Sequence, residues 1–319
     1  MRLVGSLVLT LLFAVAPAGP LGARGLGAQE GHAPAAEHGA PSVDIITPHI
    51  TDAREFEVPY WKPPFYKEVH LPHWAPIHVG GVEVDLSPTK HVVMLLLAAT
   101  LCVVVLVGAA AAHRRSSHAS GSPRGFAAGI EAMVLYLRDE VALKNIHGPG
   151  AERYVPFILT LFFFILFANL LGLIPYGSTA TGNISVTLML ALITFVVVEV
   201  SGMLTLGRSY LSTVFYWNKE LPLFVRVPMF LIMSPVEMVG KLTKPFALTI
   251  RLFANMTAGH IVVLAFIGLI FFFGNLAAGA PFLMAVAIML LELFVAFLQA
   301  FIFALLASVF IGQIRSAHH

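Results

Sequence analysis

The sequence predicts an all-α integral membrane protein with about five membrane helices, one amphipathic interfacial helix, and a C-terminal hairpin of two long, tilted helices. Hydrophobic residues are 58% of the 319 residues and charged residues 11%, whereas an average soluble domain has about 25% charged residues. The apolar residues occur in blocks that approach or exceed the ~20 residues of a spanning helix. The formal net charge of +2 is too small to indicate a nucleic-acid partner.

The first 90 residues predict two segments that precede the membrane domain. In residues 1–28, Arg2 is followed by an apolar run that is too short to span a membrane, and then by Ala16-Pro17-Ala18. This pattern is typical of a secretory signal peptide, with an uncleaved signal anchor as the alternative. Residues 29–90 are polar and proline-rich and contain six of the 13 histidines. They predict a solvated, partly ordered extracytoplasmic segment, and residues 91–315 the membrane domain.

Five apolar blocks predict the membrane helices. Their expected bounds are residues 91–112, 154–174, 185–206, 235–273 and 282–313. The last two helices are longer than a perpendicular crossing requires at about 1.5 Å per residue, so we expect them to be tilted or partly interfacial. They are joined by a short uncharged turn and should therefore run antiparallel.

The segment between the first two spans, residues 114–153, predicts the amphipathic helix. Apolar residues recur at helical spacing on one face: Ile130, Met133, Val134, Leu137 and Val141. The opposite face is charged: Glu131, Arg138, Asp139 and Lys144. Such a helix lies on the membrane surface or packs against the rest of the protein.

Lysine and arginine are distributed unevenly between the connecting segments. They cluster after the first, third and fifth spans and are absent from the short loops after the second and fourth. The positive-inside rule then places the N-terminus outside and the C-terminus in the cytoplasm. This orientation agrees with the predicted signal peptide.

Arg251 lies inside one of the most apolar stretches of the chain. Because an arginine at membrane depth costs roughly 2.5–3.5 kcal/mol on insertion scales, we expect a function for it, with a transported ion or a partner's carboxylate as its target. At about 100° per residue, a polar and small-residue stripe follows the same helix within about 40° of one line. Its members are Glu237, Lys241, Lys244, Leu248, Arg251, Asn255 and Gly259.

A second group of polar residues involves both helices of the predicted hairpin. Glu292 and Gln299 lie on one face of the last helix, seven residues apart. His260 faces a different side of its helix from Arg251, and its distance from the turn places it at a depth similar to that of Glu292. A histidine and a glutamate at one level of a bilayer could hold water and pass protons, or could form a hydrogen-bonded pair that only fixes helix packing.

Three motifs carry a resemblance to a known family. They are the run from Lys244-Pro245 through Arg251-Leu252-Phe253-Ala254-Asn255-Met256 to Ala258-Gly259, NLLGLIP at residues 169–175, and LQAFIF at residues 298–303. In order and spacing, they closely resemble subunit a of the F-type ATP synthase, from about residue 90 to residue 315. The chain departs from some bacterial members in having the histidine on the fifth helix and the acid on the sixth, as in mitochondrial members.

The resemblance implies a role for each candidate residue. Arg251 would be the arginine that faces the rotating ring of c subunits, with Asn255 as its polar neighbour. Glu237 would belong to the cytoplasmic half-channel, and the extracytoplasmic half-channel would contain His260, Glu292 and Gln299.

The implied protein is a proton-translocating stator subunit in a bacterial plasma membrane, with the c-ring, subunit b of the peripheral stalk and lipid as partners. No nucleotide-binding loop, catalytic triad or metal-ligand spacing occurs in the sequence, so we expect neither a cofactor nor ATP chemistry in this chain. A secondary proton-coupled transporter and a passive membrane scaffold are the alternative functions. The transporter would be expected to contain inverted repeats, which the sequence does not display.

Several candidate residues also have structural interpretations. Arg251 could pair with a carboxylate elsewhere in the bundle. Ser234 to Glu237 matches a capping box with a proline at the first helical position, so Glu237 could cap a helix. Lys241 and Lys244 could extend toward the cytoplasmic interface. Asn169 and Gln299 could form interhelical hydrogen bonds, which we prefer for Asn169.

Overall fold

The computed structural model describes residues 55–59, 66–74, 77–79, 82–84, 87–118, 125–174, 179–213, 215, 222–273 and 279–316. The predicted signal peptide and a large part of the N-terminal segment lie outside the described residues.

The N-terminal segment contains two antiparallel hairpins that the sequence analysis did not predict. Their strands are β1 (Glu55–Pro59), β2 (Tyr66–His70), β3 (Ile77–Val79) and β4 (Val82–Val84). β1 pairs with β2 and β3 pairs with β4, and the two ladders form separate sheets. A hydrogen bond of 3.0 Å from the backbone nitrogen of Trp74 to Ser87 Oγ ties this segment to the start of the first membrane helix.

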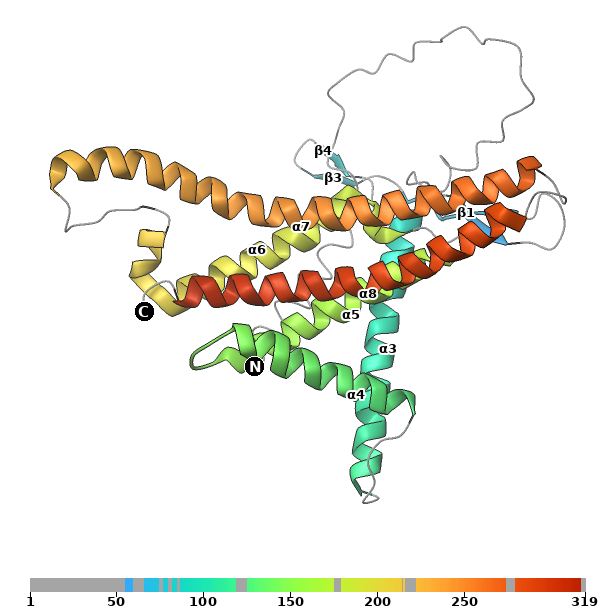
Figure 1. The fold of residues 1–319 in the computed structure, drawn as a ribbon, viewed down its shortest axis with the longest axis horizontal. Helices are drawn as coiled ribbons and strands as arrows, with labels where there is room; N and C mark the ends of the chain where they lie inside the picture. Colours follow the sequence, from blue (N-terminus) through green and yellow to red (C-terminus); the bar gives the residue numbers. More distant parts are fainter. Residues whose placement is uncertain are drawn as a thin grey trace, which may run out of the picture.

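Five of the described helices are long and apolar enough to cross a membrane, as predicted. They are α3 (Lys90–His118), α5 (Val155–Gly172), α6 (Ile184–Leu206), α7 (Leu223–Phe273) and α8 (Gly279–Ser316). The shorter helical segments are α4 (Phe126–Tyr136), η1 (Leu137–Leu143), η2 (Ala151–Tyr154), η3 (Ala180–Gly182) and η4 (Gly207–Thr213). Figure 1 shows α7 and α8 side by side as a long hairpin, with α3 running across their direction.

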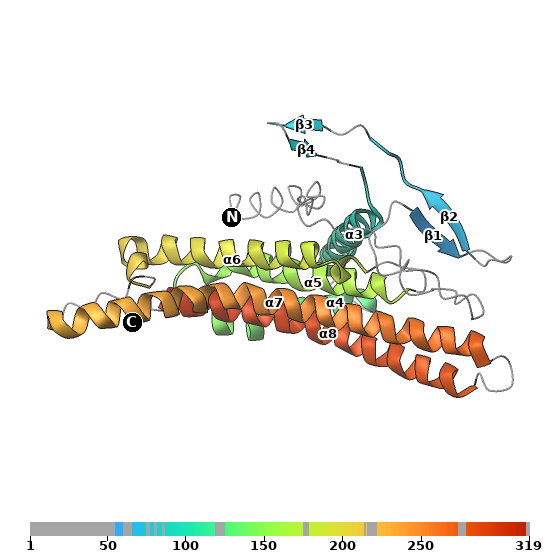
Figure 2. The ribbon, with the colours of Figure 1, turned by 90° about the horizontal axis from the view of Figure 1, so that it is seen from above.

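The helix α5 forms the centre of the bundle. In its most apolar stretch 78% of the residues are buried inside the chain, against 17% in α7. It is apolar around its whole circumference, as expected of a helix surrounded by others. Its side chains Ile158, Phe163 and Ile165 are fully buried together with Phe303 and Ile311 of α8. The perpendicular views in Figures 1 and 2 place α5 and α6 against the α7–α8 hairpin.

The helix α7 begins at Leu223, twelve residues before its predicted start at Pro235. Three prolines lie inside it, so Pro235 is not a first helical residue and the capping-box interpretation of Glu237 is wrong. Membrane helices tolerate proline where a side chain satisfies the freed backbone carbonyl. The Thr249 hydroxyl donates a 2.9 Å hydrogen bond to the carbonyl oxygen of Pro245, one turn earlier in the same helix.

The predicted amphipathic segment is split between α4 and the π-helical η1. Ile130, Leu137 and Val141 are buried, whereas Arg138 and Lys144 are exposed, so the two-faced pattern is confirmed. The apolar side contacts α3, α5 and α8. Packing against the protein accounts for these residues, and a position on the membrane surface stays a prediction.

Candidate functional site

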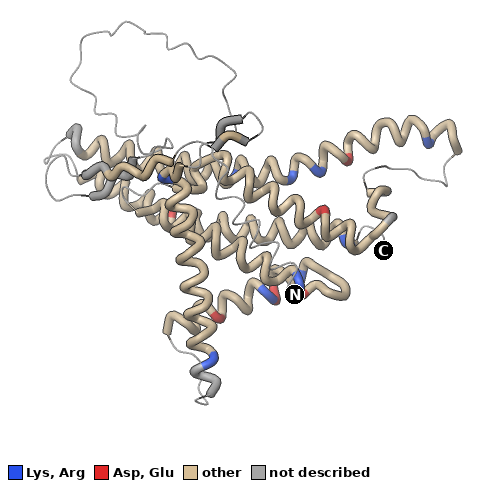
Figure 3. Tube along the Cα trace, turned by 180° about the vertical axis from the view of Figure 1, so that it is seen from behind, with Lys and Arg blue, Asp and Glu red and all other residues tan. Residues whose placement is uncertain are grey.

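The side chain of Arg251 points out of the chain. It is exposed, while Leu248 and Leu252 on the same helix are buried against the bundle. Within the described part of the chain, no hydrogen bond or ion pair involves its guanidinium. The alternative in which Arg251 pairs with a carboxylate of the bundle has no support among these residues. In Figure 3 charged residues are sparse along the helices, so few side chains of this subunit could serve as its partner.

One turn beyond Arg251, α7 and α8 are joined by a hydrogen bond. Asn255 Nδ2 donates to Gln299 Oε1 at 3.0 Å. Gln299 is almost completely buried, and its Nε2 has no hydrogen-bond partner among the described residues. A buried amide nitrogen of this kind is normally satisfied by water, so the contact lies at a place suited to hydration.

A further turn along α7, Glu292 lies directly against Gly259. A Cβ atom at position 259 would collide with Glu292 Oε1, so a larger residue there would displace the glutamate side chain. This oxygen is buried and has no hydrogen-bond partner in the described part of the chain. Because His260 follows Gly259 in the chain, it lies at the same level as Glu292. Its side chain leaves α7 about 100° around the helix axis from the face of Gly259 that Glu292 contacts.

On the other side of Arg251 the helices α6, α7 and α8 and the segment η4 line a partly open cavity of about 200 Å³. Its polar lining consists of Thr194, Glu199, Thr213, Glu237, Lys241, Lys244 and Gln313. Glu237 is exposed, and no hydrogen bond or ion pair joins it to another described residue. Leu248 also lines the cavity, which therefore reaches to within one helical turn of Arg251.

Asn169 makes the interhelical hydrogen bonds that were preferred for it. The side chain is fully buried, and its Nδ2 donates to the carbonyl oxygen of Ala296 at 3.4 Å. Its Oδ1 accepts a 2.8 Å hydrogen bond from the hydroxyl of Thr181. The residue thus connects α5, η3 and α8.

Comparison with known proteins identifies the family. The family model described as ATP synthase A chain matches residues 92–312. The chain belongs to this family. ATP synthase subunit a 2 of Chlorobaculum tepidum is 45% identical over 298 residues, which cover 90% of this chain and 78% of the relative. ATP synthase subunit a of Myxococcus xanthus is 44% identical over 292 residues, which cover 88% of this chain and 92% of the relative. ATP synthase subunit a of Anaeromyxobacter dehalogenans strain 2CP-C is 43% identical over 323 residues, which cover 95% of this chain and 80% of the relative.

The segment that matches the ATP synthase A chain family contains all six candidate residues, Glu237, Arg251, Asn255, His260, Glu292 and Gln299. Two residues of the stripe on α7 each contact a residue of α8. Asn255 contacts Gln299, and Gly259 contacts Glu292. It places Glu237 apart from them, beyond Arg251 and in the cavity wall. The order along α7 is therefore cavity, arginine, and then the contacts with α8.

Lys241 is paired with a carboxylate of the bundle, and its extension toward the membrane interface stays a prediction. Its Nζ lies 3.2 Å from Glu199 Oε2, and both side chains are only 13% exposed. Lys244 Nζ donates to Gln313 Oε1 at 3.4 Å and lies 4.8 Å from the centre of the Phe310 ring. Both lysines find their partners on neighbouring helices of the bundle, which sequence position alone does not reveal.

Glu199 was not among the candidate residues predicted from the sequence. It is the only acidic residue in the third predicted span, residues 185–206, and an ionisable side chain inside a membrane helix is a functional candidate by default. That signal was present. Its pairing with Lys241 was not visible, because the two residues are 42 positions apart.

Proposed function

We propose that this chain is the non-catalytic, proton-translocating stator subunit of a rotary F-type ATP synthase, and that the face of α7 carrying Arg251 lies against the c-ring. The observation that carries the proposal is the exposed guanidinium of Arg251 in the middle of an apolar helix, without a partner among the described residues. Family membership supports the same assignment.

The chemistry of a ring carboxylate explains why an arginine suits this position. The carboxylate must be protonated while it faces lipid, because an unpaired charge in hydrocarbon is costly. Next to a fixed cation the ionised form is favoured, and the proton is displaced toward the exit path. A guanidinium stays charged in proteins, whereas a buried lysine can lose its proton. Each charge that crosses gains about 2.3 kcal/mol per 100 mV.

Two half-channels would lie on opposite sides of Arg251. The cavity lined by Glu237 ends within one turn of the arginine and suits the cytoplasmic half-channel. Glu292 and Gln299 carry buried polar atoms without hydrogen-bond partners among the described residues, as a hydrated path requires. With His260 at the same level, they suit the extracytoplasmic half-channel. Arg251 between them would repel a proton that moved directly from one to the other.

The arrangement in the membrane follows from the lengths of the helices. With about 1.5 Å per residue, α7 is about 77 Å long, more than twice the thickness of the hydrocarbon core. With α3 crossing the bilayer, α7 and α8 lie strongly tilted, which gives the c-ring a long flank. We also infer a bacterial plasma membrane, an outside N-terminus after removal of residues 1–28, an extracytoplasmic segment to residue 90, and contacts with subunit b and lipid.

The substitution Arg251→Ala in the complete ATP synthase tests the proposal. In reconstituted vesicles we expect ATP-driven proton pumping to be abolished, because the ring carboxylate loses the cation that separates the two half-channels. Arg138→Ala, which removes an exposed arginine from η1, should pump like the wild type. Unchanged pumping by Arg251→Ala would leave a passive membrane scaffold as the function of this chain. Proton transport by the purified chain without a c-ring would instead identify a self-sufficient transporter.

A further inference from the structure

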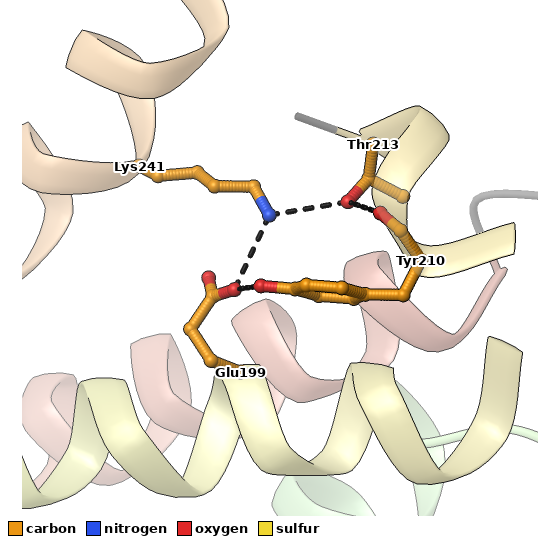
Figure 4. Close-up of polar contacts among 4 residues, drawn as sticks. All are labelled: Glu199, Tyr210, Thr213 and Lys241. Carbon is orange, nitrogen blue, oxygen red and sulfur yellow. Dashed lines mark hydrogen bonds and ion pairs between the residues drawn. The ribbon is translucent and has the colours of Figure 1, made fainter. Parts of the chain in front are cut away.

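A closed network of four side chains joins α6, η4 and α7 in the cavity wall (Figure 4). Glu199 Oε2 accepts hydrogen bonds from the Tyr210 hydroxyl and from Lys241 Nζ, the latter at 3.2 Å. Lys241 Nζ also donates to Thr213 Oγ1 at 3.2 Å and lies 4.7 Å from the centre of the Tyr210 ring. The lysine and the glutamate are therefore bound to each other and to two further groups.

The local backbone brings Tyr210 and Thr213 back to Glu199. At the end of α6, Gly207 has a φ of 57°, a conformation that favours glycine and turns the chain into η4. Within η4 the Thr213 hydroxyl donates to the carbonyl oxygen of Tyr210 at 2.7 Å. Both partners of the ion pair are thus held in place from the same short segment.

The network belongs to the cavity that carries Glu237. Glu199, Thr213 and Lys241 line this cavity together with Glu237 and Lys244. Lys244 is bound to Gln313 and Glu199 to Lys241, whereas Glu237 has no partner among the described residues. Of the two carboxylates in the described lining, only one is open to exchange protons with water in the cavity.

We propose that Lys241 and Tyr210 hold the Glu199 carboxylate out of the proton path, so that protons passing between the ring and the cytoplasm meet Glu237 as the only unpaired acid among the described residues of this cavity. Glu199 and Lys241 are positioning residues, which act on proton transfer through the charge of the cavity wall. This inference rests on the proposed function. The competing explanation is a structural tie between α6 and α7 that has no influence on proton transfer.

Removal of one partner at a time separates the two explanations. In Lys241→Met the carboxylate of Glu199 is unpaired and, when ionised, competes for protons. The pumping rate should therefore decrease at higher pH and recover at lower pH. In Glu199→Gln the cation of Lys241 is unpaired and repels protons, so pumping should fall as the pH falls. The two single variants should therefore show opposite trends with pH. The double variant should show the wild-type profile.

The measurement is ATP-driven acidification of reconstituted vesicles across the pH range in which the wild type pumps, per amount of assembled enzyme. Lys144→Met and Glu140→Gln are the matched controls, because they break an exposed pair of 2.8 Å on η1, away from the cavity. If a single variant does not assemble, Tyr210→Phe keeps the ring over Lys241 and removes one donor to Glu199. It should shift the profile in the same direction as Lys241→Met, by less.

Opposite pH trends in the two single variants, with a wild-type profile in the double variant, would support the inference. Wild-type profiles in all variants, including Tyr210→Phe, would show a structural tie only and overturn it. Arg251→Ala distinguishes this failure from that of the proposed function. If Arg251→Ala abolishes pumping while these profiles do not move, the proposed function stands and only the inference on Glu199 and Lys241 fails.

Discussion

At the scale of single residues, the contact of Gly259 with Glu292 links the packing of the hairpin to its chemistry. The glycine leaves room for a carboxylate between two apolar helices, at the level of His260. Because Glu292 Oε1 is buried without a hydrogen-bond partner among the described residues, its position depends on the space at Gly259. Small changes here should affect the carboxylate before they affect the fold.

Gly259→Ala should reduce proton pumping while the subunit still assembles. The new Cβ would lie 3.0 Å from Glu292 Cδ and 3.1 Å from Cγ, so the flexible side chain must move away. We expect a loss of about tenfold in pumping rate, equivalent to about 1.4 kcal/mol in the barrier. Gly268→Ala on the same helix is the control, because no atom lies within 4 Å of its added Cβ. Equal rates in the two variants would contradict a role for the Glu292 position.

Asn169→Ala should lower the stability of the subunit in its complex. The substitution removes the acceptor of the buried Thr181 hydroxyl and a donor to Ala296, which should cost about 1–3 kcal/mol. The temperature at which the subunit dissociates from purified ATP synthase reports the effect. Thr100→Ala should leave that temperature unchanged, because the exposed hydroxyl of Thr100 bonds only within its own helix, to Leu96. A wild-type temperature for Asn169→Ala would exclude a structural role for this amide.

At the scale of elements, the C-terminal end of α8 is anchored to the segment that follows η1. Arg315 is buried, donates a 2.9 Å hydrogen bond to the carbonyl oxygen of Pro149 and lies 5.2 Å from the centre of the Tyr154 ring. Three residues earlier, Gly312 packs against the backbone of Asn145. Because the backbones of Gly312 and Asn145 are in direct contact, neither segment can make room by a change of side-chain rotamer.

Gly312→Ala should therefore impair assembly more than it impairs transport. An added Cβ would collide with the carbonyl oxygen of Asn145 and lie 3.0 Å from its carbonyl carbon. Overpacking of this kind typically costs about 1–3 kcal/mol, and we expect less subunit in purified complexes. Gly108→Ala in α3 meets no atom within 4 Å and should assemble normally. Normal amounts of the Gly312→Ala subunit would show that α8 can shift relative to the segment that follows η1.

The bounds of the helices show which elements the sequence could predict. The third span was expected at residues 185–206 and is found at Ile184–Leu206, because an apolar block of that length between polar segments has few alternatives. The start of α7 was misplaced because Pro235 was interpreted as a first helical residue. The hairpin of β3 and β4 was missed, although two short β-prone runs flank Gly80-Gly81, a pattern typical of a tight turn.

At the scale of the whole molecule, α7 and α8 have a broad apolar surface that the other described residues do not cover. Exposed large side chains along them include Leu242, Phe246, Ile250, Leu290, Leu291, Phe294 and Leu298. An exposed apolar surface of this kind indicates contact with lipid or a protein partner. Arg251 is exposed on the same hairpin, which agrees with a c-ring on one part of this surface and lipid on the rest.

The sequence by itself determined the membrane class, the number of spanning helices, the stripe on α7 and the resemblance to subunit a, because these depend on composition, periodicity and local motifs. Tertiary structure decided which groups are paired. Helical periodicity places Lys241 and Arg251 on one stripe of α7, yet Lys241 pairs with Glu199 of α6 while Arg251 remains exposed. A charge in a bundle is stabilised by whatever the neighbouring helices bring within about 4 Å, and helical periodicity contains no information on those neighbours.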